Sequence, residues 1–412
     1  MKLRNRFLLV VLGMVVFIIT TPVIVLYALG YKFDLQTRQI TKTGSLVVKS
    51  EPDDSLVYVN DVLQPDKTDS TLRFLLPGDY NFKVDQDGYQ SWTKRLNLRS
   101  GIVTWANQNR EFISLFYDAP KIIETKSLSL AAISVEENSA IIVDNNGVSK
   151  YNPNRRNFEN ISQEVTNVNP PTQLPNTKST YYFTKDTAGK LFTPEQLANS
   201  HQLESNGQLA LLLVNNDLLL SKNGAITVFA KNVSGFHLEN EHLWYVEANT
   251  LKHATLNLGL IEQMATLPYS PIKSQVIRGN SQMFLVLDQT AYALNDKLEE
   301  VYRGVTYAYW NSEMNRLVLA NNNEALLFDP GSFRSELIIR SSSPIEQPVI
   351  NQYTGYLFFM NEGKIKAIEL DRRDHRNVYT ISTEPTKSYL VSDNGKYLTT
   401  FTETELKIQE IR

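Results

Sequence analysis

A two-strand pattern recurs seven times in the C-terminal two thirds of the chain, and it constrains the fold more than any other feature. Each copy has a mostly apolar run, a short turn and a second run, as in GYLFFMN followed by KIKAIEL. After the first copy, the second runs start at residues 217, 250, 290, 324, 364 and 405. Their spacings of 33 to 41 residues match the roughly 40-residue period of β-propeller blades. The repeat predicts a propeller over residues 118–412 with seven blades, and six or eight blades are the alternatives.

One interval in this repeat is irregular, because the second runs at 147 and 217 are much further apart than the others. The segment YYFTKDTAGKLFT between them resembles the hairpin of an extra blade, but too few residues follow it for a full four-stranded unit. We therefore expect an elaborated loop at 163–202. Within it, Thr193, Pro194 and Gln196 suit the N-cap, N1 and N3 positions of a short helix.

The last copy ends with the chain, so its outermost strand has to come from elsewhere. A propeller leaves no unpaired edge at its join if an earlier segment supplies that strand. Residues 120–126, PKIIETK, lie just before the first copy and are predicted to fill this place.

An uncharged apolar run occupies residues 7–29. As a helix its 23 residues are about 34 Å long, enough to cross a hydrocarbon core of about 30 Å. Three cations precede it, so we expect residues 1–6 in the cytoplasm, a single membrane anchor at 7–29, a juxtamembrane stalk at 30–43 and the bulk of the chain outside the cytoplasm. A cleaved signal peptide is the alternative, but the apolar core of such peptides is usually about 7–15 residues long.

Residues 44–110 have short strand-like runs and tight turns without a helical period. Six or seven strands in so short a segment predict a small β-sandwich. Pro77-Gly78 and Asp87-Gly88 are interpreted as hairpin turns within it. The expected fold class is therefore all-β apart from one N-terminal transmembrane helix, with a β-sandwich followed by a β-propeller.

The composition excludes several classes of function. The net charge is −3 and the three cations of the N-terminus precede the apolar run, so the body is mildly acidic, which argues against binding to a nucleic-acid backbone. Short basic pairs such as Arg372-Arg373 are interpreted as solvated turns. The absence of cysteine removes disulfides, thiolate nucleophiles and cysteine-ligated zinc.

No motif in the sequence makes a positive case for catalysis. There is no nucleophile elbow, phosphate loop or dinucleotide fingerprint, and the Asp-Gly turns fail the ligand spacing of a calcium loop. The five histidines show no metal spacing, and His237 and His242 need not share a face of a strand. We therefore predict no catalytic residue, no metal and no cofactor.

Six aromatic residues are candidates for a binding surface, because aromatic rings stack on sugars and anchor protein interfaces. The alternative for each of them is that it packs in the core. They are Tyr89, Trp92, Trp105, Tyr307, Tyr309 and Trp310.

Residues 44–105 resemble a PEGA domain. The resemblance lies in GSLVVKSEPDDSLVYVND and LPGDYNFKVDQDGYQSWTKRLNL, with a glycine-led strand, a proline turn, Pro-Gly-x-Tyr, and Gly-Tyr before a tryptophan. The matching positions are Gly44, Pro52, Val57, Val59, Asn60, Pro77, Gly78, Tyr80, Gly88, Tyr89 and Trp92. Asp53-Asp54-Ser55 departs from the Glu-Gly-Ala that usually follows the proline. The layout also resembles membrane-anchored bacterial PEGA proteins, and residues 120–412 resemble WD40-like or TolB-like propellers.

The resemblance implies an envelope or cell-surface protein that binds or spaces other components, and it supplies no catalytic residues. We expect a non-enzymatic binding or scaffolding protein in the cell membrane, with an envelope protein or a cell-wall glycan as its partner. The alternative is a glycan hydrolase or lyase with its site in the propeller channel. Inward carboxylates at the starts of blades would favour this alternative.

Overall fold

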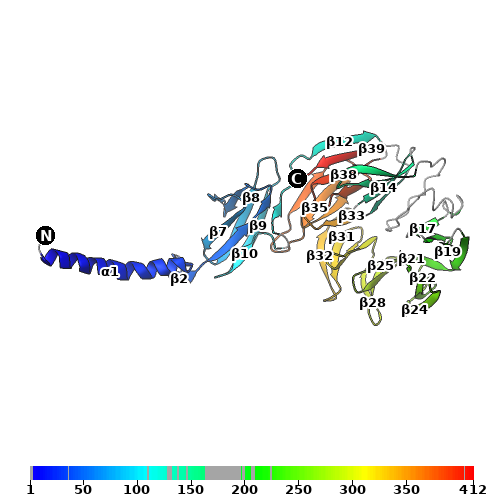
Figure 1. Cartoon of the computed structure of the whole chain (residues 1–412), viewed down its shortest axis with the longest axis horizontal. Helices are drawn as coiled ribbons and strands as arrows, with labels where there is room; N and C mark the ends of the chain where they lie inside the picture. The colour runs from blue at the N-terminus through cyan, green and yellow to red at the C-terminus, as the bar shows by residue number, and fades with distance from the viewer. Residues whose placement is uncertain are drawn as a thin grey trace. The chain divides into compact units, whose positions relative to one another are not determined.

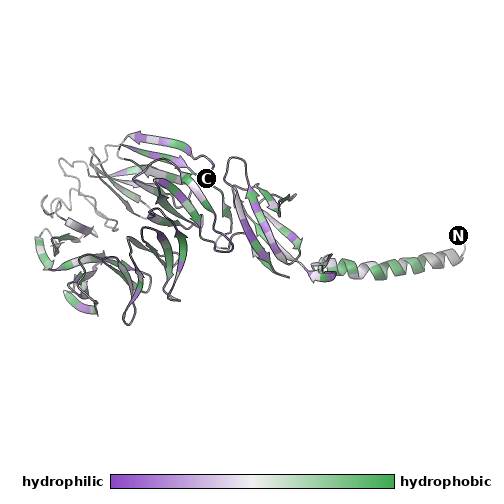
Figure 2. Ribbon diagram, turned by 180° about the vertical axis from the view of Figure 1, so that it is seen from behind, coloured by the Kyte–Doolittle hydropathy of each residue, from purple (hydrophilic) through white to green (hydrophobic). Residues whose placement is uncertain are grey.

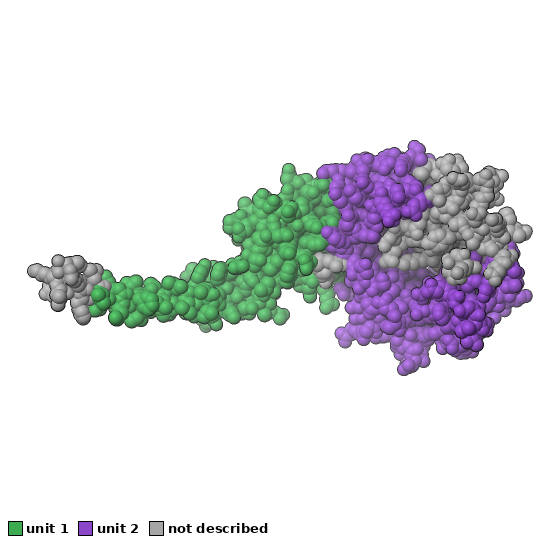
Figure 3. All heavy atoms as spheres, in the orientation of Figure 1, with its two compact units in different colours: residues 1–119, 369–377, 412 green, residues 120–368, 378–411 purple. Residues whose placement is uncertain are grey.

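The computed structural model describes residues 3–35, 37–108, 111–127, 132–136, 139–144, 147–162, 196, 200–205, 209–222, 225–402 and 404–412. These residues contain one long helix, at the N-terminus, and their other regular secondary structure is almost entirely β-strand, which confirms the predicted all-β class with one apolar N-terminal helix (Figure 1). The chain forms two compact units (Figure 3). Unit 1 contains residues 1–119, 369–377 and 412, and unit 2 contains residues 120–368 and 378–411.

Unit 1 begins with helix α1 (Leu3–Ala28), which is apolar on all sides where its side chains are described (Figure 2). Two residues after the helix ends at Ala28, Gly30 takes the left-handed conformation (φ +83°) that glycine adopts without strain. A two-stranded hairpin follows, of β1 (Tyr31–Asp34) and β2 (Gln39–Lys42). It occupies the predicted stalk.

The rest of unit 1 is the predicted β-sandwich. Its strands are β3 (Gly44–Val48), β4 (Ser50–Glu51), β5 (Leu56–Val59), β6 (Val62–Leu63), β7 (Ser70–Leu75), β8 (Gly78–Asp85), β9 (Trp92–Leu98), β10 (Val103–Trp105) and β11 (Ile113–Ser114). They form the sheets β10-β3-β7, β6-β5-β8-β9 and β11-β4. Alternate residues of the strands point inward, as in β9, and Leu46, Phe82 and Leu96 are among the residues of one buried core.

One of the two predicted hairpin turns of the sandwich is wrong. β8 and β9 are antiparallel partners, so Asp87 and Gly88 do lie in a hairpin connection, with Gly88 at φ +78°. β7 instead pairs with β3, and β8 pairs with β5 and β9. Pro77-Gly78 therefore crosses from one sheet to the other. Alternating strands on both sides of a Pro-Gly turn do not distinguish these two connections, because both bury one face of each strand.

Unit 2 contains seven four-stranded antiparallel sheets in the part of the chain that the structure describes. Those that start with the earlier strands are β13 (Ala132–Glu136), β14 (Ser139–Asp144), β15 (Gly147–Asn152) and β16 (Asn157–Ser162); β17 (Ser200–Ser205), β18 (Leu209–Val214), β19 (Asp217–Lys222) and β20 (Ala225–Ala230); and β21 (Val233–Glu239), β22 (His242–Glu247), β23 (Thr250–Thr255) and β24 (Leu260–Thr266).

The later sheets are built in the same way. They are β25 (Ser274–Arg278), β26 (Met283–Leu287), β27 (Thr290–Leu294) and β28 (Leu298–Arg303); β29 (Tyr307–Asn311), β30 (Arg316–Ala320), β31 (Glu324–Asp329) and β32 (Arg334–Arg340); β33 (Glu346–Asn351), β34 (Tyr356–Asn361), β35 (Lys364–Glu369) and β36 (Val378–Ser382); and β12 (Lys121–Ser127) with β37 (Ser388–Val391), β38 (Tyr397–Phe401) and β39 (Glu405–Glu410).

The predicted strand pairs are the two middle strands of all seven sheets. A middle strand is covered on both faces, so it is almost continuously apolar, and every residue of β26 and of β34 is buried. Fourth strands such as β20 and β24 are mostly exposed, and their sequences carry a weaker pattern.

The prediction of how the last sheet is completed is confirmed. β12 pairs antiparallel with β39, with Thr125 opposite Lys407 and Ser127 opposite Glu405. The fourth strand of the last sheet thus comes from the segment that precedes the first sheet.

The elaborated loop predicted at 163–202, with its short helix, lies almost entirely outside the described residues, and β17 starts within its last residues at Ser200. Seven sheets agree with seven blades, and the number of blades in the ring remains a prediction.

The first strands of neighbouring sheets lie against one another. β21 contacts β17 and β25, β29 contacts β25 and β33, and β13 contacts β37. The fit is close at Gly235, where an added Cβ would lie 2.0 Å from the carbonyl oxygen of Ser274. A side chain at this position would push β21 away from β25.

Candidate functional site

The structure places two of the six aromatic candidates inside the protein. Trp92 has no exposed surface, and Tyr309 is 2% exposed. The hydroxyl of Tyr309 accepts a hydrogen bond from the backbone N–H of Ile350 at 2.8 Å. These two rings therefore pack in the cores of their units, and they do not contribute to an exposed surface.

Tyr89 and Trp105 lie further out in unit 1. Tyr89 is half-buried, with its ring centroid 4.5 Å from that of Tyr117. Trp105 is 41% exposed, and the ammonium nitrogen of Lys49 lies 5.9 Å from its ring centroid. Trp105 is thus the one tryptophan among the candidates with a largely accessible ring.

Tyr307 and Trp310 both belong to β29 and are half-buried. Trp310 stacks on the buried ring of Phe284 at 5.3 Å, and its indole N–H donates to Asn280 at 3.3 Å. Tyr307 packs edge-on against Tyr309 at 5.8 Å. The six candidates therefore do not form one surface.

A buried ionic cluster in unit 1 joins the PEGA-like strand β9 to segment 369–377. Lys94 has no exposed side-chain surface, and its ammonium nitrogen lies 2.8 Å from Glu369 and 3.8 Å from Asp371. The indole N–H of Trp92 donates to Glu369 at 3.0 Å, and the side-chain amide of Asn377 donates to the same carboxylate at 2.8 Å. Five polar groups thus satisfy one another inside unit 1.

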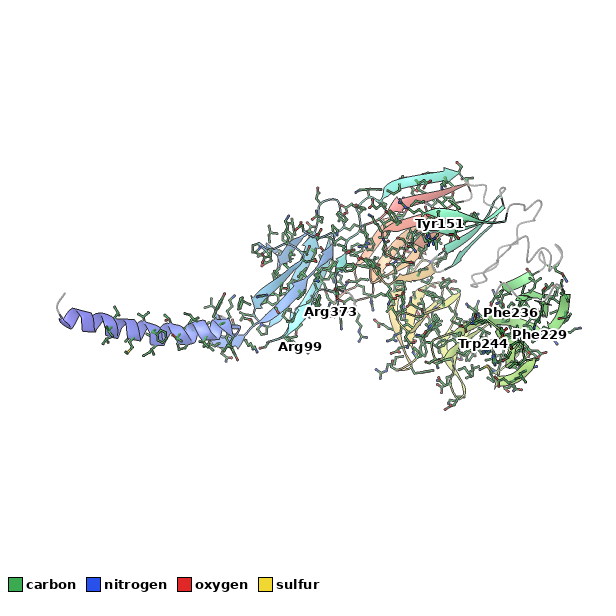
Figure 4. All side chains as sticks on the ribbon, in the orientation of Figure 1. Arg99, Tyr151, Phe229, Phe236, Trp244 and Arg373 are labelled. Atoms are coloured by element: carbon green, nitrogen blue, oxygen red, sulfur yellow. The ribbon has the colours of Figure 1, made fainter. Side chains whose placement is uncertain are left out.

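Arg373 completes this cluster (Figure 4). Its guanidinium donates to Asp371 at 2.6 Å and to the backbone carbonyls of Trp105 and Ala106, both at 2.9 Å. Burial alone raises the pKa of Asp371, but the hydrogen bonds from Arg373 and the charge of Lys94 outweigh it and lower that pKa. The interpretation of Arg372-Arg373 as a solvated turn is therefore wrong for Arg373.

A row of aromatic and titratable side chains crosses the sheet of β21 to β24 in unit 2. The strand register puts His237, Trp244, His253 and Glu262 directly opposite one another on successive strands. His253 bonds Glu262 at 2.7 Å and His242 at 3.0 Å. The rings of His242 and His253 lie 5.8 and 4.9 Å from the ring of Trp244. Three of the five histidines thus share one face of one sheet.

The next sheet covers this row. The guanidinium of Arg278, on β25, lies 4.5 Å from the ring centroid of Trp244, and it pairs with Glu239 at 3.0 Å. Trp244 is consequently only 5% exposed (Figure 4). The row packs two sheets together with a cation–π contact.

Glu204, on β17, is the carboxyl group with the most perturbed environment in this region. One of its oxygens accepts from the backbone N–H of Leu238 and the other from the side-chain amide of Gln202, both at 2.6 Å. His237 lies 3.6 Å away. Burial raises the pKa of Glu204 to about 7, although both hydrogen bonds lower it.

In the described part of the chain, no group of three or more histidine, aspartate or glutamate side chains is arranged to hold a metal ion. The expected absence of a cofactor and of catalysis remains a prediction. Sequence reasoning missed the histidine row because it depends on strand register. The paired runs HLWYVEA and TLKHATLN contain the signal, since a two-residue turn between them places His253 opposite Trp244.

Residues 43–111 match the family model of the PEGA domain. The chain therefore contains a PEGA domain. The match covers strands β3 to β10 of the sandwich, including β9 with Trp92 and Lys94. The PEGA domain thus contributes Lys94 to the buried cluster, and segment 369–377 contributes the carboxylates.

No curated protein matches the chain. Among solved structures, the extracellular domain of BT4673 from B. thetaiotaomicron is similar at a TM-score of 0.43 and 11% sequence identity, over 71% of this chain and 39% of that one. Virginiamycin B lyase from Staphylococcus aureus is similar at a TM-score of 0.41 and 13% identity, over 70% of this chain and 99% of that one. The chain thus spans well under half the length of the first of these proteins.

Proposed function

We propose that this chain is a single-pass membrane protein that holds its PEGA domain and its propeller outside the cytoplasm as a non-enzymatic binding or scaffolding module. The supporting observation is α1. Its segment Val10–Ala28 has a mean hydropathy of 2.6, and none of it is buried in the protein. Such a helix is long enough to cross a bilayer and exposes apolar side chains that water does not solvate.

Contacts at the end of α1 favour a retained anchor over a cleaved signal peptide. The backbone N–H and the hydroxyl of Thr43 both donate to the carbonyl of Gly30, at 2.8 and 2.7 Å. The ring of Tyr27 stacks on that of Phe74 at 4.8 Å. The last turn of the helix is therefore part of the folded structure of unit 1, and cleavage would remove it. The three cations that precede the apolar run of α1, Lys2, Arg4 and Arg6, favour a cytoplasmic N-terminus.

The binding surface that we propose is the pair of outer strands β20 and β24 in unit 2. Among the described strands, each pairs with a neighbour on one side only and so leaves a backbone edge without a strand partner. Ile226 and Val228 on β20 are 39% and 51% exposed, and Leu260 and Ile261 on β24 are 63% and 54% exposed. An edge with apolar side chains is suited to a partner that adds a strand or packs an apolar face against it.

The partner that we propose is an envelope protein, with a cell-wall glycan as the alternative. The test is capture with the full chain in detergent, followed by cross-linking to a solubilised envelope fraction. The double variant Val228→Glu, Leu260→Glu changes the proposed surface. Leu337→Glu, on the outer strand β32 and 44% exposed, is the matched control.

We expect the unaltered chain and the control to capture the same protein and the double variant to lose it. Capture that the double variant retains would contradict the proposed surface. Retention of polysaccharide alone, with shortening of its chains, would contradict the non-enzymatic proposal.

The environment of Glu204 favours the second candidate function, a glycan hydrolase or lyase in the propeller. Glu204 belongs to the first strand of its sheet, and a carboxyl group whose pKa is raised to about 7 is suited to a general acid. Glycoside hydrolysis usually needs a second carboxylate opposite the first. If the chain shortens an envelope polysaccharide, Glu204→Gln should abolish that activity, and unchanged activity would exclude this role of Glu204.

A further inference from the structure

Exposed apolar side chains gather on the hairpin that follows α1. Phe33 on β1 and Ile40 on β2 are direct cross-strand partners, so they lie side by side on one face. They are 54% and 57% exposed, and Leu35 just beyond them is 82% exposed. A soluble surface has no need of an aligned aromatic–aliphatic pair that nothing covers.

The hairpin is held at the end of α1. Its first strand starts at Tyr31, and Thr43, just after its second strand, donates two hydrogen bonds to Gly30. Four strand residues extend about 13 Å. The hairpin therefore stays within about 13 Å of the end of the apolar helix. If α1 crosses a bilayer, this is the level at which hydrocarbon gives way to headgroups.

The adjoining end of the sandwich is apolar too. The backbone N–H of Ser45 donates to the carbonyl of Ile102 at 3.2 Å, and Val103 is the partner of Ser45 in the sheet. Ile102 and Val103 are 52% and 57% exposed. The hydroxyl of Ser100 donates to the carbonyl of Lys42 at 3.0 Å, which ties this end of the sandwich to the base of the hairpin.

Positive charge surrounds these apolar residues although the body of the chain is acidic. Five exposed cations lie on the hairpin or at the neighbouring end of the sandwich, and none forms an ion pair within the described residues: Lys32, Arg38, Lys42, Arg73 and Arg99. The hairpin has one acidic residue, Asp34, and Asp79 on β8 already pairs with Arg95 at 2.9 Å. This excess of cations is complementary to anionic lipid headgroups.

We propose that this membrane-facing surface, formed by the hairpin 31–42 and by residues 73, 99, 102 and 103, lies in the interface of the bilayer that α1 crosses. Phe33, Leu35 and Ile40 insert between the headgroups, and the cations bind lipid phosphates. The inference rests on the proposed membrane anchor. The PEGA domain is then held against the lipid surface and does not swing freely on a stalk.

The absence of cysteine makes a direct test straightforward, because one introduced cysteine carries one spin label. Val16→Cys in α1, Thr37→Cys at the tip of the hairpin and Asp87→Cys in the exposed turn between β8 and β9 are labelled one at a time. The full chain is placed in nanodiscs of phosphatidylcholine with or without phosphatidylglycerol. The readout is the accessibility of each label to oxygen, which partitions into lipid, relative to a water-soluble nickel chelate.

We expect the accessibility ratio at position 37 to be several-fold higher than at position 87 and to rise further with phosphatidylglycerol. In the triple variant Phe33→Ser, Leu35→Ser, Ile40→Ser, the ratio at position 37 should fall to that at position 87. The matched control is Val62→Ser, Leu63→Ser, an equally exposed apolar pair on β6, and it should leave the ratio unchanged.

The outcomes separate this inference from the proposed anchor. A lipid-exposed label at position 16 together with a water-exposed label at position 37 in both lipid mixtures would overturn the inference and leave the anchor standing. A water-exposed label at position 16 would overturn both. Spin–spin broadening at position 37 could instead grow with the number of chains per nanodisc. That result would show that a second copy of the chain, and not lipid, covers the surface, and it would overturn the inference.

Discussion

Lys94 has no exposed side-chain surface, and its ammonium group lies between the carboxylates of Glu369 and Asp371. The energy of such a group depends on its partners, because a buried charge without a counter-charge is far less stable than a satisfied pair. An exposed pair of the same kind contributes little, since water screens it. Lys83, on the neighbouring strand β8, is half-buried and pairs with Asp85 at 3.3 Å, so the two lysines allow a buried ion pair to be compared with a solvent-accessible one in the same sheet.

Lys94→Met should lower the free energy of unfolding of unit 1 by about 3–5 kcal/mol, because it leaves Glu369 buried without its cation. Lys83→Met should cost less than about 1 kcal/mol. The double variant Lys94→Met, Glu369→Gln should recover part of the loss. Denaturant unfolding monitored by tryptophan fluorescence measures these effects, and equal losses for Lys94→Met and Lys83→Met would contradict the account of the buried cluster.

Glu204 predicts a dependence of stability on pH. Because burial raises its pKa from 4.5 to about 7, the folded state holds this proton over a range in which the unfolded state has lost it. The free energy of unfolding should therefore fall as the pH rises from about 4.5 to 7, by up to about 3 kcal/mol. Glu204→Gln should remove this dependence, because the amide that replaces the carboxyl group does not titrate over this range.

The melting temperature of the full chain in detergent, measured at several pH values across this window, checks the prediction. Glu239→Gln is the matched control, since Glu239 is exposed and pairs with Arg278. If the melting temperature of Glu204→Gln changes with pH as steeply as that of the unaltered chain, groups other than Glu204 cause the pH dependence.

At the scale of the elements, the packing of first strands against one another is the feature most sensitive to single substitutions. Gly235 on β21 has no room for a Cβ, because the backbone of β25 occupies that space. At Gly331 an added Cβ would meet only Asp329, at an ordinary contact distance of 3.4 Å. The two glycines therefore provide a matched comparison.

Gly235→Ala should destabilise unit 2 by about 1–3 kcal/mol or more, since the contact is with backbone and neither strand can rotate away. Gly331→Ala should be nearly neutral. Thermal unfolding followed by circular dichroism in the β region distinguishes them. A neutral Gly235→Ala would mean that β21 and β25 are not packed as closely as described.

The elements that could be predicted from the sequence are those with a local signal. The middle strands of the sheets are continuously apolar because both of their faces are covered, so runs such as QMFLVLD identify them. The fourth strands, such as β24, have no comparable run. Pro77-Gly78 was predicted as a hairpin turn because its flanking alternation is the same whether the strands pair or belong to opposite sheets.

Whether each candidate residue is exposed or buried depends on contacts between distant parts of the chain, which the local sequence does not show. Trp92 and Tyr309 look like surface aromatics beside polar neighbours, but a core surrounds each of them. Arg373 lies in a charged run of a kind that is typical of solvent-exposed turns. The carboxylate that neutralises it belongs to Asp371, only two residues earlier. What could not be predicted is that segment 369–377 folds with a domain more than 250 residues earlier in the sequence.

At the scale of the whole molecule, the closure of unit 2 joins residues that are far apart in the chain. Thr125 on β12 lies opposite Lys407 on β39. The double variant Thr125→Cys, Lys407→Cys should form an intramolecular disulfide under mild oxidation and raise the melting temperature, because it closes a very long loop. Thr125→Cys with Gln409→Cys, which lies out of register, is the control. Equal cross-linking of both pairs on a non-reducing gel would contradict the register.

The proposed membrane-facing surface and the proposed position of the propeller outside the cytoplasm both depend on α1 being a membrane anchor. The most direct test is Asp87→Cys in the full chain, treated in intact cells with a maleimide that does not cross membranes. We predict labelling in intact cells, on a chain that stays in the membrane fraction after alkaline washing and still contains residues 1–29. Labelling only after lysis, or a soluble chain that lacks α1, would contradict the account.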